Sequence, residues 1–170
     1  MARDLRGSAL VGAQVVCVSA LAWPGAPRWR LPRPVRVGAG LAVVVGNAVA
    51  AAGTLRLGRH LSALPAPPGH AVLRTDGAYG VIRHPIYAGL LMASTGWAVH
   101  RARPEPLVAV GLLSVVLHVK AGYEERLLRE RFGAAYDDYA ARVPRLLPVP
   151  RPSSARQPAH HEAAGATPRR

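Results

Sequence analysis

Two clusters of charged and aromatic residues carry the side chains of this chain that are best suited to chemistry. The first, residues 77–89, reads Gly-Ala-Tyr-Gly-Val-Ile-Arg-His-Pro-Ile-Tyr-Ala-Gly. The second, residues 124–144, begins with two adjacent glutamates and ends with Arg-Val-Pro, with Phe-Gly and two tyrosines between them. Together they offer guanidinium, imidazole and carboxylate groups, which bind charged ligands and move protons.

Each cluster alone has a purely structural interpretation. An Arg-His-Pro segment can anchor and start a helix at lipid head groups, and Glu125 can pair with Arg129 along a solvated helix face. Between the clusters, however, lie two apolar stretches, residues 85–99 and 107–119. A hairpin of two helices returns to the side from which it starts. We therefore predict that the clusters meet at one membrane boundary, where charges are costly and usually functional.

Two further apolar segments precede the clusters and predict membrane spans. Residues 7–27 contain no charged residue, and residues 37–55 form an uncharged run of nineteen. A spanning helix needs roughly twenty such residues. The basic start of the chain also resembles the n-region of a signal peptide, but a second membrane segment follows, which favours an uncleaved span. Trp23 and Trp29 suit an interfacial aromatic belt.

The two stretches of the hairpin are short for plain membrane spans. They contain fifteen and thirteen residues, where roughly seventeen is the usual minimum. They would lean on the first two spans as a short helical hairpin. Alternatively, the second stretch continues as one helix through the glutamates to Phe132, and Gly133 then terminates it.

The composition favours a membrane surface over nucleic acid as the partner. Half of the 170 residues are hydrophobic although the formal net charge is +13, and Lys120 is the only lysine. These facts agree if arginines flank apolar spans and face acidic head groups. No stacking-aromatic motif or helix-turn-helix pattern supports nucleic-acid binding. The single Cys17 excludes a disulfide within the chain and predicts a buried thiol.

These observations predict an all-α, multi-pass transmembrane helical bundle of about four apolar helices with a C-terminal cytoplasmic helical extension. Residues 1–150 would form one domain, and the basic residues 151–170 a disordered tail without a metal site. Glycines in the second span would let helices approach closely. Arginines near the hairpin ends predict that those ends face the cytoplasm and that the protein lies in the plasma membrane. The arginines of residues 28–36 count against this orientation.

The spacing of the clusters resembles the isoprenylcysteine carboxyl methyltransferase family. The pattern is G-x-Y-x-x-x-R-H-P-x-Y-x-G, an apolar hairpin, E-E with F-G eight residues after the first Glu, and Y-x-x-Y-x-x-R-V-P, over about residues 57–148. Phospholipid N-methyltransferases carry a similar, looser signature. The resemblance implies methyl transfer from S-adenosylmethionine to a lipophilic acceptor, an isoprenylcysteine-type carboxylate or similar. The chain is shorter at its N-terminus than eukaryotic members, so their prenylated-protein substrate does not carry over directly.

The resemblance also implies which residues surround the cofactor. They are Tyr79, Arg83, His84, Pro85, Tyr87, Glu124 and Glu125. Arg83 would pair with the carboxylate of the cofactor, and a glutamate with its ammonium or sulfonium. Glu125 and His84 are the candidate bases for an acceptor that must lose a proton. Arg142 is a candidate for binding an acceptor carboxylate or a lipid phosphate.

Three other functions remain open. One is phospholipid N-methyl transfer. Another is an NADPH-dependent membrane reductase, because steroid-reductase-like proteins share an Arg-His-Pro-x-Tyr-like segment. The third is a non-enzymatic membrane adaptor, in which the two clusters need not meet. The paired glutamates and the tyrosine-containing tail favour the methyltransferase, and no Rossmann glycine fingerprint indicates a soluble-type domain.

Overall fold

The chain folds into helices across the whole part that the structure describes. A computed structural model describes residues 5–58 and 72–148, and these contain six helices and no strand. The helices are α1 (Leu5–Leu21), α2 (Arg33–Leu57), α3 (Ala78–Val81), α4 (Pro85–Arg101), α5 (Pro104–Phe132) and α6 (Ala134–Arg142). The predicted all-α class is confirmed, whereas the predicted tail, residues 151–170, lies outside the described residues.

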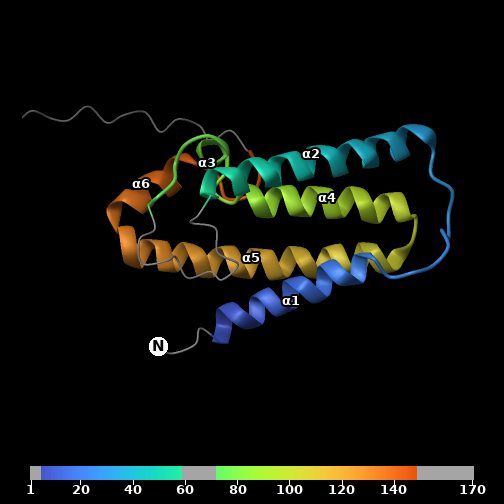
Figure 1. The fold of residues 1–170 in the computed structure, drawn as a ribbon, viewed down its shortest axis with the longest axis horizontal. Helices are drawn as coiled ribbons and strands as arrows, with labels where there is room; N and C mark the ends of the chain where they lie inside the picture. Colours follow the sequence, from blue (N-terminus) through green and yellow to red (C-terminus); the bar gives the residue numbers. More distant parts are fainter. Residues whose placement is uncertain (1–4, 59–71, 149–170) are drawn as a thin grey trace, which may run out of the picture.

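A hairpin of α4 and α5 forms the centre of the molecule. The α2 helix runs alongside α4, and α1 crosses α5, so the two N-terminal helices flank the hairpin (Figure 1). The short helices α3 and α6 lie together at the open end of the hairpin, beside the start of α4 and the end of α5 (Figure 1). This topology brings the two polar clusters of the sequence to one end of the bundle.

Two of the helices are long and apolar enough to cross a membrane. They are α2, with 25 residues, and α5, with 29. At 1.5 Å per residue they measure about 38 and 44 Å, which exceeds a hydrocarbon core of about 30 Å. The α1 helix has only 17 residues. It ends at Leu21, three residues before Pro24, and is shorter than the uncharged run of residues 7–27 indicates.

The α5 helix also corrects the short-hairpin expectation for residues 107–119. It continues through the glutamates to Phe132, as in the alternative interpretation. Lys120 and Glu125 do not interrupt it because both side chains are buried against neighbouring elements rather than left in an apolar medium. The helix ends at Gly133, whose φ of +52° favours glycine.

Glycine allows α2 and α4 to approach closely. A Cβ atom on Gly46 would lie 2.5 Å from the Ala93 amide nitrogen and 2.6 Å from the Gly89 carbonyl oxygen. Gly89 in turn faces the backbone of Gly46 and Ala50. Real Cβ atoms do not tolerate such distances to backbone, so both glycines are steric requirements. The prediction that glycines in the second span serve helix packing is confirmed for Gly46 and Gly53, whereas a Cβ atom on Gly38 or Gly40 would meet nothing within 4 Å.

The core beneath the polar end lies between α1, α4 and α5. It contains Cys17, Tyr87, Leu113, Leu117 and Ala121, all buried. The thiol of Cys17 is free and buried, as predicted. This packing holds Tyr87 with its ring in the apolar core while its hydroxyl reaches the polar end.

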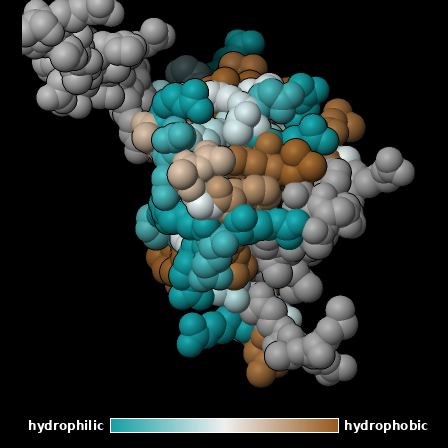
Figure 2. Space-filling model, turned by 90° about the vertical axis from the view of Figure 1, so that its left-hand side faces the viewer, coloured by the Kyte–Doolittle hydropathy of each residue, from teal (hydrophilic) through white to brown (hydrophobic). Residues whose placement is uncertain are grey.

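The outer surface of the bundle is apolar along the helices and polar at the end with α3 and α6. Large apolar side chains on α1, α2 and α5 are exposed, including Val16, Leu41, Val44, Leu112 and Val115. Exposed apolar surface of this extent marks contact with lipid or protein. Figure 2 looks at the polar end, where hydrophilic residues dominate. The bundle therefore has a lipid-compatible wall and a water-compatible end.

Candidate functional site

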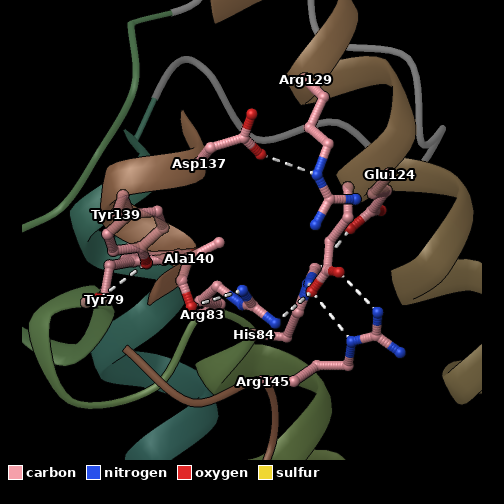
Figure 3. Close-up of polar contacts among 10 residues, drawn as sticks. Tyr79, Arg83, His84, Glu124, Arg129, Asp137, Tyr139, Ala140 and Arg145 are labelled. Carbon is pink, nitrogen blue, oxygen red and sulfur yellow. Dashed lines mark hydrogen bonds and ion pairs between the residues drawn. The ribbon is translucent and has the colours of Figure 1, made fainter. Parts of the chain in front are cut away.

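The two polar clusters meet at the open end of the hairpin (Figure 3). Arg83 Nη2 lies 3.1 Å from Glu125 Oε1, and His84 Nε2 lies 3.2 Å from the same oxygen. His84 and Glu125 are 41 residues apart in sequence. The prediction that the two clusters meet is therefore confirmed. A non-enzymatic membrane adaptor does not require this meeting.

Glu125 is the centre of the cluster. Its side chain has no solvent exposure, and two segments of the chain, residues 83–84 and the stretch after α6, supply its three partners. Arg145 binds it in a bidentate manner, with Nε 2.9 Å from Oε1 and Nη2 2.5 Å from Oε2. Arg83 and His84 complete the shell. A buried carboxylate needs such compensation, because removing a charge from water is costly unless it is paired and hydrogen-bonded.

Backbone hydrogen bonds hold the partner segments in place. The Arg83 amide donates to the Pro144 carbonyl oxygen at 2.8 Å, and the His84 amide donates to the Arg145 carbonyl oxygen at 3.1 Å. Arg83 Nη1 also donates to the Ala140 carbonyl oxygen at 3.0 Å. The segment after α6 therefore folds back across the start of α4, and this return places the Arg145 guanidinium on Glu125.

His84 lies between the two glutamates. Its Nδ1 is 3.4 Å from Glu124 Oε2, and its Nε2 is 3.2 Å from Glu125 Oε1. Tyr87 stacks on the imidazole with the ring centroids 5.4 Å apart, and its hydroxyl donates to Glu124. A ring with a carboxylate at each nitrogen donates to both only when it is protonated.

The histidine predicts a pH dependence of stability. Burial opposes the imidazolium, but hydrogen bonds to Glu124 and Glu125 raise the pKa of His84 above its ordinary 6.5. A raised folded-state pKa contributes stability that is full below the ordinary value and is lost as pH rises through the folded pKa. The free energy of unfolding in detergent should therefore fall as pH rises above the ordinary value of 6.5, and His84→Gln should reduce that slope. Equal slopes in both proteins would contradict the assignment.

Tyrosines from α3 and α6 enclose the cluster. The Tyr139 hydroxyl donates to the Tyr79 carbonyl oxygen at 2.7 Å, and so attaches α6 to α3. Burial and the charge of Glu124 raise the pKa of Tyr79. Burial chiefly raises the pKa of Tyr136 to about 12, with Glu125 contributing. These tyrosines stay neutral and serve as hydrogen-bonding groups and walls rather than bases.

Seven of the eight predicted site residues gather at this end, and one does not. Tyr79, Arg83, His84, Pro85, Tyr87, Glu124 and Glu125 belong to the cluster or line it. Arg142 is exposed at the end of α6, where its Nε donates to the Asp138 carbonyl oxygen at 3.1 Å. Among the described residues it makes no ion pair with the glutamates.

Sequence reasoning missed Arg145, the cation that the C-terminal segment places on Glu125. Its place directly after Val143-Pro144 was the available signal, because a proline favours an extended chain that can return over the helix ends. Glu125 likewise pairs with Arg83 and Arg145 rather than with Arg129, which binds Asp137 at 3.0 Å instead. The solvated-face interpretation of Glu125 is wrong.

Two buried polar atoms in this cluster lack hydrogen-bond partners within residues 5–58 and 72–148. They are the Tyr136 hydroxyl and Arg83 Nε. Glu124 is the more accessible glutamate, with its side chain 19% exposed against 0% for Glu125. The site thus combines fixed cations, an accessible carboxylate and spare donors. That donor set suits a ligand carrying both a carboxylate and a positive charge.

The fold and the site define a helical membrane protein with a buried ion cluster at the end of a hairpin. The chain belongs to the phospholipid methyltransferase family, whose sequence profile matches residues 35–135. The matched region contains α4, α5 and both clusters up to Gly133 and the start of α6.

Curated relatives include methyltransferases of two kinds. Protein-S-isoprenylcysteine O-methyltransferase B of Arabidopsis thaliana is 39% identical over 82 residues, which cover 46% of this chain and 41% of the relative. A probable protein-S-isoprenylcysteine O-methyltransferase of Oryza sativa subsp. indica is 32% identical over 110 residues, covering 62% and 57%. Methanethiol S-methyltransferase 2 of Bradyrhizobium diazoefficiens is 37% identical over 75 residues, covering 44% and 28%. The chain thus matches only part of each relative's length.

Proposed function

We propose that this protein transfers a methyl group from S-adenosylmethionine to a lipophilic acceptor at the membrane interface. The observation that carries the proposal is the buried cluster around Glu125, built by both ends of a hairpin with an apolar outer wall. Family membership and the names of the relatives support it. A carboxylate acceptor of isoprenylcysteine type is the favoured substrate, and a phospholipid amine, suggested by the family's description, is the second candidate.

The residues present fit the cofactor by their chemistry. S-adenosylmethionine supplies an electrophilic methyl group on a sulfonium, and its amino acid portion carries a carboxylate and an ammonium. Arg83, with its spare Nε, would bind the carboxylate. Glu124 would bind the ammonium or attract the sulfonium, since it is partly exposed, whereas Glu125 is occupied by three partners. Tyr79 and Tyr87 would contact the adenine or the sulfonium through their rings.

Glu125 and His84 act mainly as positioning residues in this proposal. Glu125 holds Arg83, His84 and Arg145 in one arrangement, and displacement at a methyl group depends on positioning and exclusion of water. A carboxylate acceptor needs no base. For an amine or thiol acceptor, His84 is the proposed base. Because hydrogen bonds to both glutamates favour its imidazolium form, this role requires a pH above its raised pKa.

The membrane arrangement is also part of the proposal. We propose four apolar helices, α1, α2, α4 and α5, with α6 as an extension on the cytoplasmic side of the plasma membrane. The long α2 and α5 and the polar end seen in Figure 2 support this arrangement. Residues 1–150 would act as one domain. Arg142, exposed on α6, would contact a lipid phosphate rather than the reacting carboxylate.

Methyl transfer from labelled S-adenosylmethionine tests the function. Protein reconstituted in liposomes, supplied with an S-prenylcysteine carboxylate, should release label into the organic phase as a base-labile ester. His84→Ala should lower the rate about tenfold or more, because the ring positions Glu124. Arg126→Ala, an exposed cation on α5, is the control and should leave the rate unchanged. Base-stable label in phosphatidylethanolamine would instead identify N-methyl transfer, and no transfer to either acceptor would contradict the proposal.

A further inference from the structure

Lys120, the only lysine of the chain, is buried in the wall of the bundle. It lies on α5, and 4% of its surface is exposed. Its Nζ donates to Gln14 Oε1 on α1 at 2.9 Å and lies 5.2 Å from the centroid of the Tyr87 ring. Both partners are neutral. The ion pairs within residues 5–58 and 72–148 do not include Lys120, although the charge of Glu124 acts on it from beyond ion-pair distance.

An ammonium in this position lacks the partner that burial demands. Charged groups within apolar helices are rare, and they pair with each other or mark the path of a substrate or ion. The nearest acid along the helix, Glu124, lies one turn further on and is already bound by Tyr87 and His84. The surroundings of Lys120 therefore provide hydrogen bonding and a ring face but no direct countercharge.

Tyr87 connects this lysine to the proposed cofactor site. The Lys120 ammonium lies over the Tyr87 ring, the ring also stacks on His84, and the Tyr87 hydroxyl donates to Glu124. The four residues from Lys120 to Glu124 rise about 6 Å along the helix axis, so Lys120 lies on the apolar side of the glutamates at about that depth. A lipophilic acceptor that enters between the helices at this depth would contact Lys120 beside the proposed reacting centre.

We infer that Lys120, oriented by Gln14, binds the anionic head of the methyl acceptor, a carboxylate or a thiolate, and thereby selects against amine acceptors. This inference rests on the proposed function. The acceptor anion supplies the countercharge that the ammonium lacks. An ammonium acceptor is repelled by it, and the neutral amine would gain no charge-assisted bond. The nucleophile is held in its deprotonated form, so no side chain needs to remove a proton.

The competing interpretation is that Lys120 only ties α1 to α5 through Gln14. If Lys120 has only this structural role, its replacement changes stability, and its response to an acceptor does not depend on the charge of the acceptor. The two interpretations therefore separate in an experiment that varies acceptor charge at constant apolar length.

A single isotope-labelled lysine provides that experiment, because biosynthetic labelling gives one side-chain resonance, from Lys120. The full chain in detergent is titrated with an S-prenylcysteine carboxylate, its neutral methyl ester and an alkylamine of equal chain length. We expect the carboxylate to shift the Lys120 resonance in a saturable manner, and the ester and the amine to leave it in place. No shift with the carboxylate, or equal shifts with carboxylate and ester, would overturn the inference.

Kinetics provide the second measurement. Lys120→Met should raise the KM for the carboxylate about tenfold or more, the loss expected for one charge-assisted bond, while the affinity for S-adenosylmethionine is kept. Lys120→Arg should bring the KM most of the way back to the wild-type value. Arg126→Met is the matched control on the same helix. An unchanged KM in Lys120→Met would overturn the inference but not the proposed function. Absence of S-adenosylmethionine binding in the wild type would instead overturn the proposed function.

Discussion

Replacing Glu125 with alanine is expected to lower the free energy of unfolding by about 3–5 kcal/mol, the usual cost of removing one partner of a buried ion pair. The carboxylate has no exposed surface, and it compensates Arg83, Arg145 and His84 together. Without it, three cationic or protonated groups would lie close together at the end of the bundle. The fold-back of the C-terminal segment would lose the contact that holds Arg145.

The effect is measured by chemical or thermal unfolding in one detergent at constant pH. Glu130→Ala is the matched control, since Glu130 lies on the same helix with its side chain 64% exposed and forms an i,i+4 pair with Arg126. It should change stability little. Glu125→Gln keeps the shape of the side chain but removes its charge, and it is measured in case the alanine variant does not fold. If Glu125→Gln matched the wild type in stability and in cofactor affinity, the central role of Glu125 would be wrong.

Gly89→Ala is expected to destabilise the protein by about 1–3 kcal/mol through overpacking. The added methyl group would meet the backbone of Gly46 and Ala50 on α2, which cannot rotate away as a side chain can. The α2 and α4 helices would have to separate, and Arg83 and His84 directly precede α4. We therefore expect the variant to lose cofactor affinity as well as thermal stability.

Gly111→Ala on α5 is the control, and it should leave stability unchanged or raise it slightly. Nothing lies within 4 Å of a Cβ atom at this position, and alanine favours a helix over glycine by up to about 1 kcal/mol. Its unfolding temperature should be unchanged or slightly higher. Equal destabilisation by both substitutions would show that glycine serves no close approach between α2 and α4.

The meeting of Arg83-His84 with Glu124-Glu125 was predictable because it follows from topology alone. Two apolar stretches joined by a short connection must return to the same side, so residues at their outer ends come together. The length of α5 was less predictable. Its apolar run stops before Lys120, and a sequence does not show that Gln14 binds Lys120 or that cations from other segments compensate Glu125.

The role of Arg145 was beyond sequence reasoning for a related reason. Its position depends on two backbone hydrogen bonds, from Arg83 and His84 to the carbonyl oxygens of Pro144 and Arg145. These bonds depend on two turns of the chain, one at Gly133 and one after α6. Arg142 carries the same charge three residues earlier, and only the fold-back decides which guanidinium reaches the carboxylate.

Calorimetric titration of the detergent-purified chain with S-adenosylmethionine tests the central claim most directly. The account predicts saturable binding at one site per chain, at least tenfold weaker in Glu125→Gln because its ion pairs align the site, and unchanged in Glu130→Ala. NADPH, titrated under the same conditions, should not bind. Binding of NADPH without binding of S-adenosylmethionine, or full cofactor affinity in both His84→Ala and Glu125→Gln, would contradict the assignment of this cluster as the methyl-donor site.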